Sequence, residues 1–499
     1  MLHMNNTKKF DFNKKISINF EWWEITWNAG LLAFHEFCEK LQIQKLLQTY
    51  LPETRKWNFE HTKPEIIYQK IIRIASWDTS NNNYEYHIKD PSFLKIHNSK
   101  IASAPTCSRL ENTFDFSDAI NIKKIISEVE KYNILFSKTK EIILDIDSSN
   151  DPSSEKLEWS KFIFHYWLNW FAPLFMFNGL NWDFISWILK PWNYHCSSLS
   201  YSMVREKINF YRDLWVKDIS LRWDSAFPND NLMWECEKNN IYYFFKLKTY
   251  WNLKQYFLDD LKKKGINDIS EIRWKTIFVE FKHQAQNWSK ERRIIWCVDW
   301  KQAETSESKK NRKKNWNKGF KQLELFPVFS FVITNNLKLS PEEVFSMYNW
   351  RATIETCIEE AKNWFGIDEL SNSKFRVNST NFQIFCLAIQ LVQLFRKFTL
   401  SKDSREIIKQ KEIKKNNNFK FYENEMKKFN KLKQWRKIIS FQKVDTIRKK
   451  VFNIPAKVIS SWRQIFFKCA SSFKFKDLFF NILDTIQTLP KLYNLCKIE

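Results

Sequence analysis

The sequence predicts an α/β protein in which a strand-rich centre lies between two helical regions. Apolar residues recur at helical spacing before about residue 132, and the chain is helix-like again from Asn378 onward. Between these regions, short apolar runs have the length of strands. The clearest of these runs are Glu141–Asp147, Ile219–Asp224, Ile241–Leu247, Thr276–Phe281, Arg293–Val298 and Val328–Thr334.

The chain is long enough for several domains, because 499 residues correspond to about two to four of them. From the change of pattern we place a helical region at 1–132. An α/β domain at 133–375 follows it, and a basic helical region at 376–499 ends the chain. The last region contains Ser401–Lys450, which has 17 basic and 6 acidic residues and forms either a DNA-facing surface or a solvated face.

The net charge favours a polyanionic partner. The chain has 80 Lys and Arg residues against 56 Asp and Glu residues, a formal charge of +24. Nucleic acid is the commonest partner of so basic a protein. A soluble basic protein with no such partner is the alternative on charge alone. The basic run Ser306–Lys321 lacks periodicity, and we expect it to be an exposed loop.

Cysteine usage and apolar patterning indicate a cytoplasmic protein. The nine cysteines form no CxxC pair, so neither a disulfide framework nor a zinc site is indicated. Phe162–Trp182 is apolar and long enough to span a bilayer. Asn178-Gly179 is a hairpin turn signal within this segment, so we expect two buried strands and no membrane partner.

A well-marked helix begins at Ser340. Ser340 is a suitable N-cap, Pro341 suits the first helical position, and Glu343 completes a capping box. The pattern predicts a helix that continues to about Trp364.

This helix carries Tyr348, Arg351, Glu355 and Lys362, separated by 3, 4 and 7 residues. At about 100° per residue, these steps keep all four side chains on one face. The face is either a functional site or a solvent face in which Arg351 and Glu355 form an i,i+4 ion pair.

Two aspartates strengthen the functional interpretation. Asp147 and Asp224 each end a short apolar strand, and open sheets place functional groups at strand ends. Phosphodiester chemistry commonly uses two divalent ions about 4 Å apart, held by carboxylate oxygens. Taken singly, each Asp is more often a turn or cap residue.

The spacing Tyr348-(2)-Arg351-(3)-Glu355-(6)-Lys362 resembles the Tyr-Arg-Glu-Lys signature of DDE transposases from bacterial insertion sequences. Other segments resemble one branch, the insertion-sequence thirteen-eighty family, in order from about Phe12 to Leu400. These segments are Asp90–Phe93, Pro105–Asn112, Leu144–Asp151, Leu189–Asn193 and Leu221–Phe227.

The resemblance implies an RNase H-like catalytic fold with a β-rich insertion at about 228–335. It places the catalytic, metal-binding carboxylates on Asp147, Asp224 and Glu355, with Asp145 as the competing choice for the first. The implied cofactor is Mg²⁺, as two ions, for which Mn²⁺ can substitute. The residues implied to contact DNA are Tyr348, Arg351, Lys362 and Arg222. We also expect the helical region 1–132 to bind DNA and the basic region 376–499 to add DNA or subunit contacts.

The activity implied is metal-dependent DNA cleavage and strand transfer at the ends of an insertion sequence. The partners are double-stranded DNA, as transposon ends and as target, and a second copy of the chain in a homodimer on DNA. We expect a cytoplasmic, nucleoid-associated protein. An inactive DNA-binding remnant and an RNase H-like nuclease are the alternatives.

The sequence departs from the family pattern in its glycines. It has 5 Gly and 24 Trp. Trp192 and Trp350 stand where the family has glycine, and so do Ala226 and Ala352. A Trp cannot replace Gly where φ must be positive. A GGA codon changed to TGA and read as tryptophan is one explanation.

Overall fold

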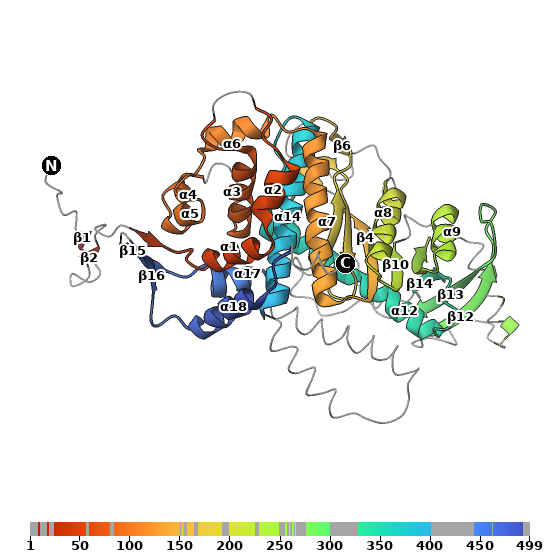
Figure 1. Cartoon of the computed structure of the whole chain (residues 1–499). Coiled ribbons are helices and arrows are strands. Elements are labelled where there is room, and N and C mark those ends of the chain that lie inside the picture. Colours follow the sequence, from red (N-terminus) through yellow and green to blue (C-terminus); the bar gives the residue numbers. More distant parts are fainter. Residues whose placement is uncertain are drawn as a thin grey trace. The chain divides into compact units, whose positions relative to one another are not determined.

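The computed structural model of the chain divides into two compact units (Figure 1). The central unit spans Ile134–Glu359, and the terminal unit combines Met1–Asn133 with Glu360–Glu499. The structure describes residues 8–9, 17–18, 24–55, 59–79, 84–149, 151–153, 157–163, 168–191, 199–224, 229–248, 255–256, 259, 262–263, 265, 276–299, 328–400, 444–461 and 463–492.

An eight-stranded mixed sheet organises the central unit, in the order β12-β13-β14-β11-β10-β4-β8-β9. Its strands are β4 (Glu141–Ser148), β8 (Leu174–Asn178), β9 (Phe184–Ile188), β10 (Asp218–Trp223), β11 (Tyr242–Leu247), β12 (Ile277–His283), β13 (Arg292–Asp299) and β14 (Val328–Thr334). Strands β4, β10 and β11 are parallel to one another, and the other neighbouring pairs are antiparallel. A small separate sheet contains β5 (Asp151–Ser153), β6 (Lys161–Ile163) and β7 (Leu168–Phe171).

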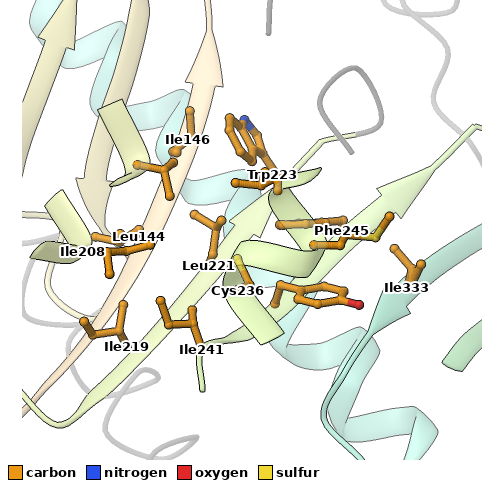
Figure 2. Packing of buried hydrophobic residues seen from close by; sticks show 14 of the residues in the cluster. Leu144, Ile146, Ile208, Ile219, Leu221, Trp223, Cys236, Ile241, Phe245 and Ile333 are labelled. Atoms are coloured by element: carbon orange, nitrogen blue, oxygen red, sulfur yellow. The ribbon is translucent and has the colours of Figure 1, made fainter. Parts of the chain in front are cut away.

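The main core lies between one face of this sheet and two helices, α8 (Ser200–Asp213) and α9 (Asp230–Lys238). Leu144 and Ile146 of β4 and Leu221 and Trp223 of β10 point into it, together with Ile208 of α8 (Figure 2). Side chains alternate between the faces of a strand. The residues between these apolar ones therefore face the opposite side of the sheet.

The six strands predicted from the sequence all form, with bounds that differ by at most two residues. The strands of the predicted insertion extend the central sheet and do not form a sheet of their own. The hairpin predicted around Asn178-Gly179 is confirmed as β8 and β9. No helix among the described residues is long and apolar enough to cross a membrane.

The terminal unit joins the helices of both ends of the chain. Lys70 donates to Glu111 at 2.7 Å and to Asn381 at 2.9 Å, and Gln390 donates to the carbonyl of Ile126 at 3.1 Å. Its helices are α1 (Leu31–Lys40), α2 (Ile43–Tyr50), α3 (Lys63–Ala75), α4 (Tyr84–Ile88), α5 (Pro91–Ile96), α6 (Ala104–Glu111), α7 (Phe116–Ser137), α14 (Phe375–Leu400), α17 (Val444–Ile447), the π-helix η4 (Arg448–Phe452) and α18 (Lys476–Thr488). Helix α7 ends within the central unit.

The sequence suggested a helical C-terminal region, but the structure also contains strands there. Strand β15 (Ala456–Ser460) pairs with β16 (Ile465–Cys469) and with β3 (Ile25–Thr26). A further short pair is formed by β1 (Lys8–Lys9) and β2 (Ser17–Ile18). The predicted basic loop at Ser306–Lys321, Trp192 and Ala226 lie outside the described residues, as does 401–443 of the basic C-terminal run.

Among the residues that the structure describes, four tryptophans occupy the left-handed backbone region: Trp77 (φ 83°), Trp159 (63°), Trp182 (64°) and Trp215 (60°). Trp77 and Trp215 follow helices α3 and α8 in Schellman motifs, where glycine is the usual residue. In the second motif, the Trp215 N–H donates to Arg212 and the Val216 N–H to Tyr211. A side chain at positive φ costs about 1–2 kcal/mol, so these helix ends are strained by their own sequence.

We therefore expect Trp215→Gly to raise the free energy of unfolding by about 1 kcal/mol, because Trp215 is 82% exposed and loses little packing. Trp234→Gly is the matched control. Trp234 is also exposed but lies within helix α9, where glycine costs about 1 kcal/mol. Denaturant unfolding of both variants measures the difference, and a loss of stability in Trp215→Gly would contradict the strain.

Candidate active site

The carboxyl ends of β4 and β10 bring two acids to the same edge of the sheet. The strands are parallel and in register, with Trp223 beside Ile146 as the last pair. One residue further, Asp147 and Asp224 follow on the two strands. Both point to the face opposite the α8–α9 core, because their neighbours on either strand point into that core.

The predicted helix supplies the remaining polar groups. Its capping box forms as expected, with the Glu343 N–H donating to Ser340 Oγ and the Ser340 N–H donating to the Glu343 carboxylate. Helix α12 (Pro341–Asn349) then passes through a 3₁₀ turn, η3 (Trp350–Ala352), into α13 (Thr353–Phe365). Trp350 has φ −63°, so this family glycine position requires no positive φ in this chain.

Arg351 is the centre of the cluster. Its Nη1 lies 2.9 Å from Asp147 Oδ2, and its Nη2 lies 3.8 Å from Glu355 Oε1. Tyr348 Oη donates to Asp224 Oδ1 at 3.5 Å. The Arg351 side chain is only 9% exposed and that of Glu355 is 67% exposed. The i,i+4 pair therefore exists, but the closer partner of Arg351 is the strand acid Asp147, so the helix face is not a simple solvent face.

Burial and charge shift the proton affinities of these groups. Burial raises the pKa of Asp147, and Arg351 opposes that shift while Asp224 adds to it. Burial raises the pKa of Tyr348 to about 12, with Arg351 opposing and Asp224 adding. Burial alone would lower the pKa of Arg351, but Asp147, Tyr348 and Asp224 raise it above its usual value. Arg351 is therefore a permanent cation among acids.

Arg222 does not lie where the sequence suggested. Its side chain is fully buried, and it binds the equally buried carboxylate of Asp145. Its Nη1 also donates to the carbonyl of Met347 at 2.7 Å. Arg222 is thus paired inside the fold, and its position in the free chain lends no support to the predicted DNA contact. Because the carboxylate of Asp145 is already paired with Arg222, Asp147 is the better choice for the first acid of the site.

The sequence held a signal for this pair that strand periodicity could have revealed. Asp145 precedes Asp147 by two residues, and Arg222 precedes Asp224 by two residues. Residues two apart share a face of a strand, so the alignment of the two strands also aligns the pair. Lys362 lies two turns beyond Glu355 on α13 and belongs to the terminal unit, so its role stays a prediction.

The donor chemistry of the cluster suits a hard divalent cation. Asp147, Asp224 and Glu355 offer carboxylate oxygens, which Mg²⁺ prefers. Among the residues that the structure describes, no group of three or more His, Cys, Asp or Glu side chains converges closely enough to hold a metal ion. The Arg351 guanidinium contacts two of the three acids.

Comparison with known proteins identifies the class as a DDE-type transposase, an enzyme. Residues 8–416, more than half of the chain, match the family described as Transposase DDE domain group 1, and the chain belongs to that family. Transposases of this type use divalent metal ions, generally Mg²⁺. The narrower resemblance to the thirteen-eighty branch and its signature stays a prediction.

Two further comparisons add little detail. The cryo-EM structure of a piggyBac transposase synaptic complex with hairpin DNA is similar over 93% of this chain and 85% of that one. The identity is 10% and the TM-score is 0.38, which is too low to transfer residue roles. No curated protein matches the chain.

A double-mutant cycle with Asp147→Asn and Arg351→Gln should give a coupling of about 1–3 kcal/mol, because both side chains are largely buried. The control is the i,i+4 pair of Asp445 with Lys449, whose side chain is 65% exposed, and for which about 0.3–0.5 kcal/mol is expected. Unfolding free energies of the single and double variants measure both couplings. A coupling no larger than that of the control would show that Arg351 does not anchor Asp147.

Proposed function

We propose that this transposase cleaves DNA at the ends of its insertion sequence and joins those ends to target DNA, with Asp147, Asp224 and Glu355 as the catalytic acids. The observation that carries the proposal is the convergence of two strand-end aspartates and one helix on Arg351. These groups come from three segments far apart in sequence. A surface with no function has no need to gather like charges in this way.

We further propose that β9, β8, β4, β10 and β11 form an RNase H-like core. The three parallel strands and the antiparallel β8–β9 hairpin at one edge support this assignment. Strand β11 falls within 228–335, the range that the resemblance assigned to the insertion, but here it belongs to the proposed core. Strands β12, β13 and β14 are then the inserted part, which lengthens the sheet before the chain returns in α12.

In this proposal, Asp147, Asp224 and Glu355 hold two Mg²⁺ ions, for which Mn²⁺ can substitute. Bound there, such ions lower the pKa of the attacking water or hydroxyl group and stabilise the leaving oxygen. Asp147 and Asp224 are placed by the sheet, whereas the exposed Glu355 can approach from α13. Arg351 and Tyr348 bind phosphate beside the acids, where a guanidinium can donate two parallel hydrogen bonds. Lys362 contributes a further phosphate contact.

The partner in this proposal is double-stranded DNA. A formal charge of +24 provides long-range attraction to phosphates. Because each DNA end needs its own set of three acids, pairing two ends requires a homodimer on DNA. The expected location is the nucleoid in the cytoplasm.

Cleavage of DNA that carries the element's ends, with Mg²⁺ or Mn²⁺, tests the proposal. Asp147→Asn, Asp224→Asn and Glu355→Gln should each lower the rate by about 100-fold or more, because several kcal/mol of charge stabilisation are lost. Glu359→Gln is the matched control, since Glu359 is exposed one turn further along α13. We expect this control to retain the full rate.

Equal cleavage by wild type and Glu355→Gln would contradict the site. Salt-dependent DNA binding without cleavage would identify an inactive remnant. Cleavage without strand-transfer products would identify a nuclease.

A further inference from the structure

We infer that Asp145 and Arg222 form a buried positioning pair that sets the distance between the acid-bearing strands and anchors the helix of Tyr348. The inference rests on the proposed function and adds two residues that act through others. Both side chains have no exposed surface. Arg222 Nε donates to Asp145 Oδ1 at 2.5 Å, and Nη2 donates to Oδ2. The two residues are also direct partners in the register of β4 with β10.

The pair lies directly behind the two candidate catalytic aspartates. Asp147 comes two residues after Asp145 on β4, and Asp224 comes two residues after Arg222, directly past the end of β10. That separation is about 6.6 Å along a strand. A bidentate arginine–carboxylate pair is rigid and planar. Any shift of one strand against the other would break it, and the spacing of Asp147 and Asp224 depends on the same alignment.

The guanidinium also reaches two other segments. Its Nη1 donates to the carbonyl of Met347, the residue before Tyr348 on α12. Its Nη2 approaches the carbonyl of Gly179 at 3.4 Å, in the turn between β8 and β9. A Cβ atom on Gly179 would overlap with both Arg222 and Asp145. One side chain thus joins β4, β10, the β8–β9 turn and α12.

A buried ion pair of this kind usually contributes little to the free energy of unfolding, so stability alone does not explain its presence. Replacing a buried ion pair with apolar side chains of similar size is often neutral or stabilising. Removing one partner leaves an uncompensated buried charge and can unfold the protein. The double variant Asp145→Leu/Arg222→Met is therefore the informative one. It keeps the core filled but removes the bidentate contact between the two side chains and the hydrogen bond to the carbonyl of Met347.

The first readout needs no DNA. The coupling between Asp147 and Arg351 is measured by unfolding in the wild-type and in the Asp145→Leu/Arg222→Met backgrounds. The positioning role predicts that this coupling falls by at least half, because β4 and the end of α12 lose their common anchor. An unchanged coupling in a folded double variant would overturn the inference. This result does not depend on whether the chain cleaves DNA.

The second readout separates placement from binding. With end-containing DNA and Mg²⁺, the double variant should bind DNA within about 3-fold of wild type, while its single-turnover cleavage rate falls at least about 10-fold. Arg222→Lys should not restore the rate, because lysine cannot make the bidentate contact. A full rate in the double variant contradicts the inference. If wild type does not cleave, the proposed function fails, and the coupling measurement still decides the positioning role.

An independent observation supports a second inference. Trp77, Trp159, Trp182 and Trp215 all have positive φ, and two of them occupy the glycine position of a Schellman motif. The chain has 24 Trp but only 5 Gly. We infer that these four are glycine positions of the fold, and that the codon translated here as tryptophan specifies glycine in the source organism.

Peptide mass measurement on the protein from its own host tests this inference. The expected result is a glycine mass at all four positions, with TGA as their codon. Tryptophan masses at these positions would overturn it, and the residues would then be ordinary substitutions that strain the turns.

Discussion

The parallel pairing of β4 with β10 is the constraint on which the candidate site depends. It places Asp147 and Asp224 side by side at one edge of the sheet, and it places Asp145 opposite Arg222 one step behind them. Both effects follow from one register. A slip of one strand by one residue would turn its polar side chains toward the α8–α9 core. The apolar side chains on the other face, such as Leu144 and Leu221, oppose such a slip because those of the shifted strand would leave that core.

Two layers of charge lie on this face, and they differ in exposure. The inner layer is the ion pair of Asp145 with Arg222, and both side chains are fully buried. The outer layer, Asp147 with Arg351, is partly open, and Glu355 lies mostly in solvent. Like charges gathered in a partly buried place need a cation. Arg351 supplies that charge in the free chain; in the proposed function, a divalent ion or a phosphate group would take over part of this role when DNA is bound.

Sequence reasoning predicted the local features well. The six strands and the capping box at Ser340 depend on patterns within a few residues, which short-range physics determines. It failed where side chains meet across the fold. The resemblance implied a DNA contact for Arg222, whereas its partners in the structure, Asp145 and Met347, are 77 and 125 residues away in the sequence. The strained turns at Trp77 and Trp215 could be recognised only from their backbone φ angles, which the structure provides.

The central claim is that Asp147, Asp224 and Glu355 act as one metal site on DNA. Anomalous scattering from Mn²⁺ in crystals of the DNA complex tests it most directly. We expect metal peaks coordinated by the carboxylates of Asp147 and Asp224, with Glu355 drawn in and Arg351 moved onto phosphate. Metal peaks that contact none of the three carboxylates would contradict it.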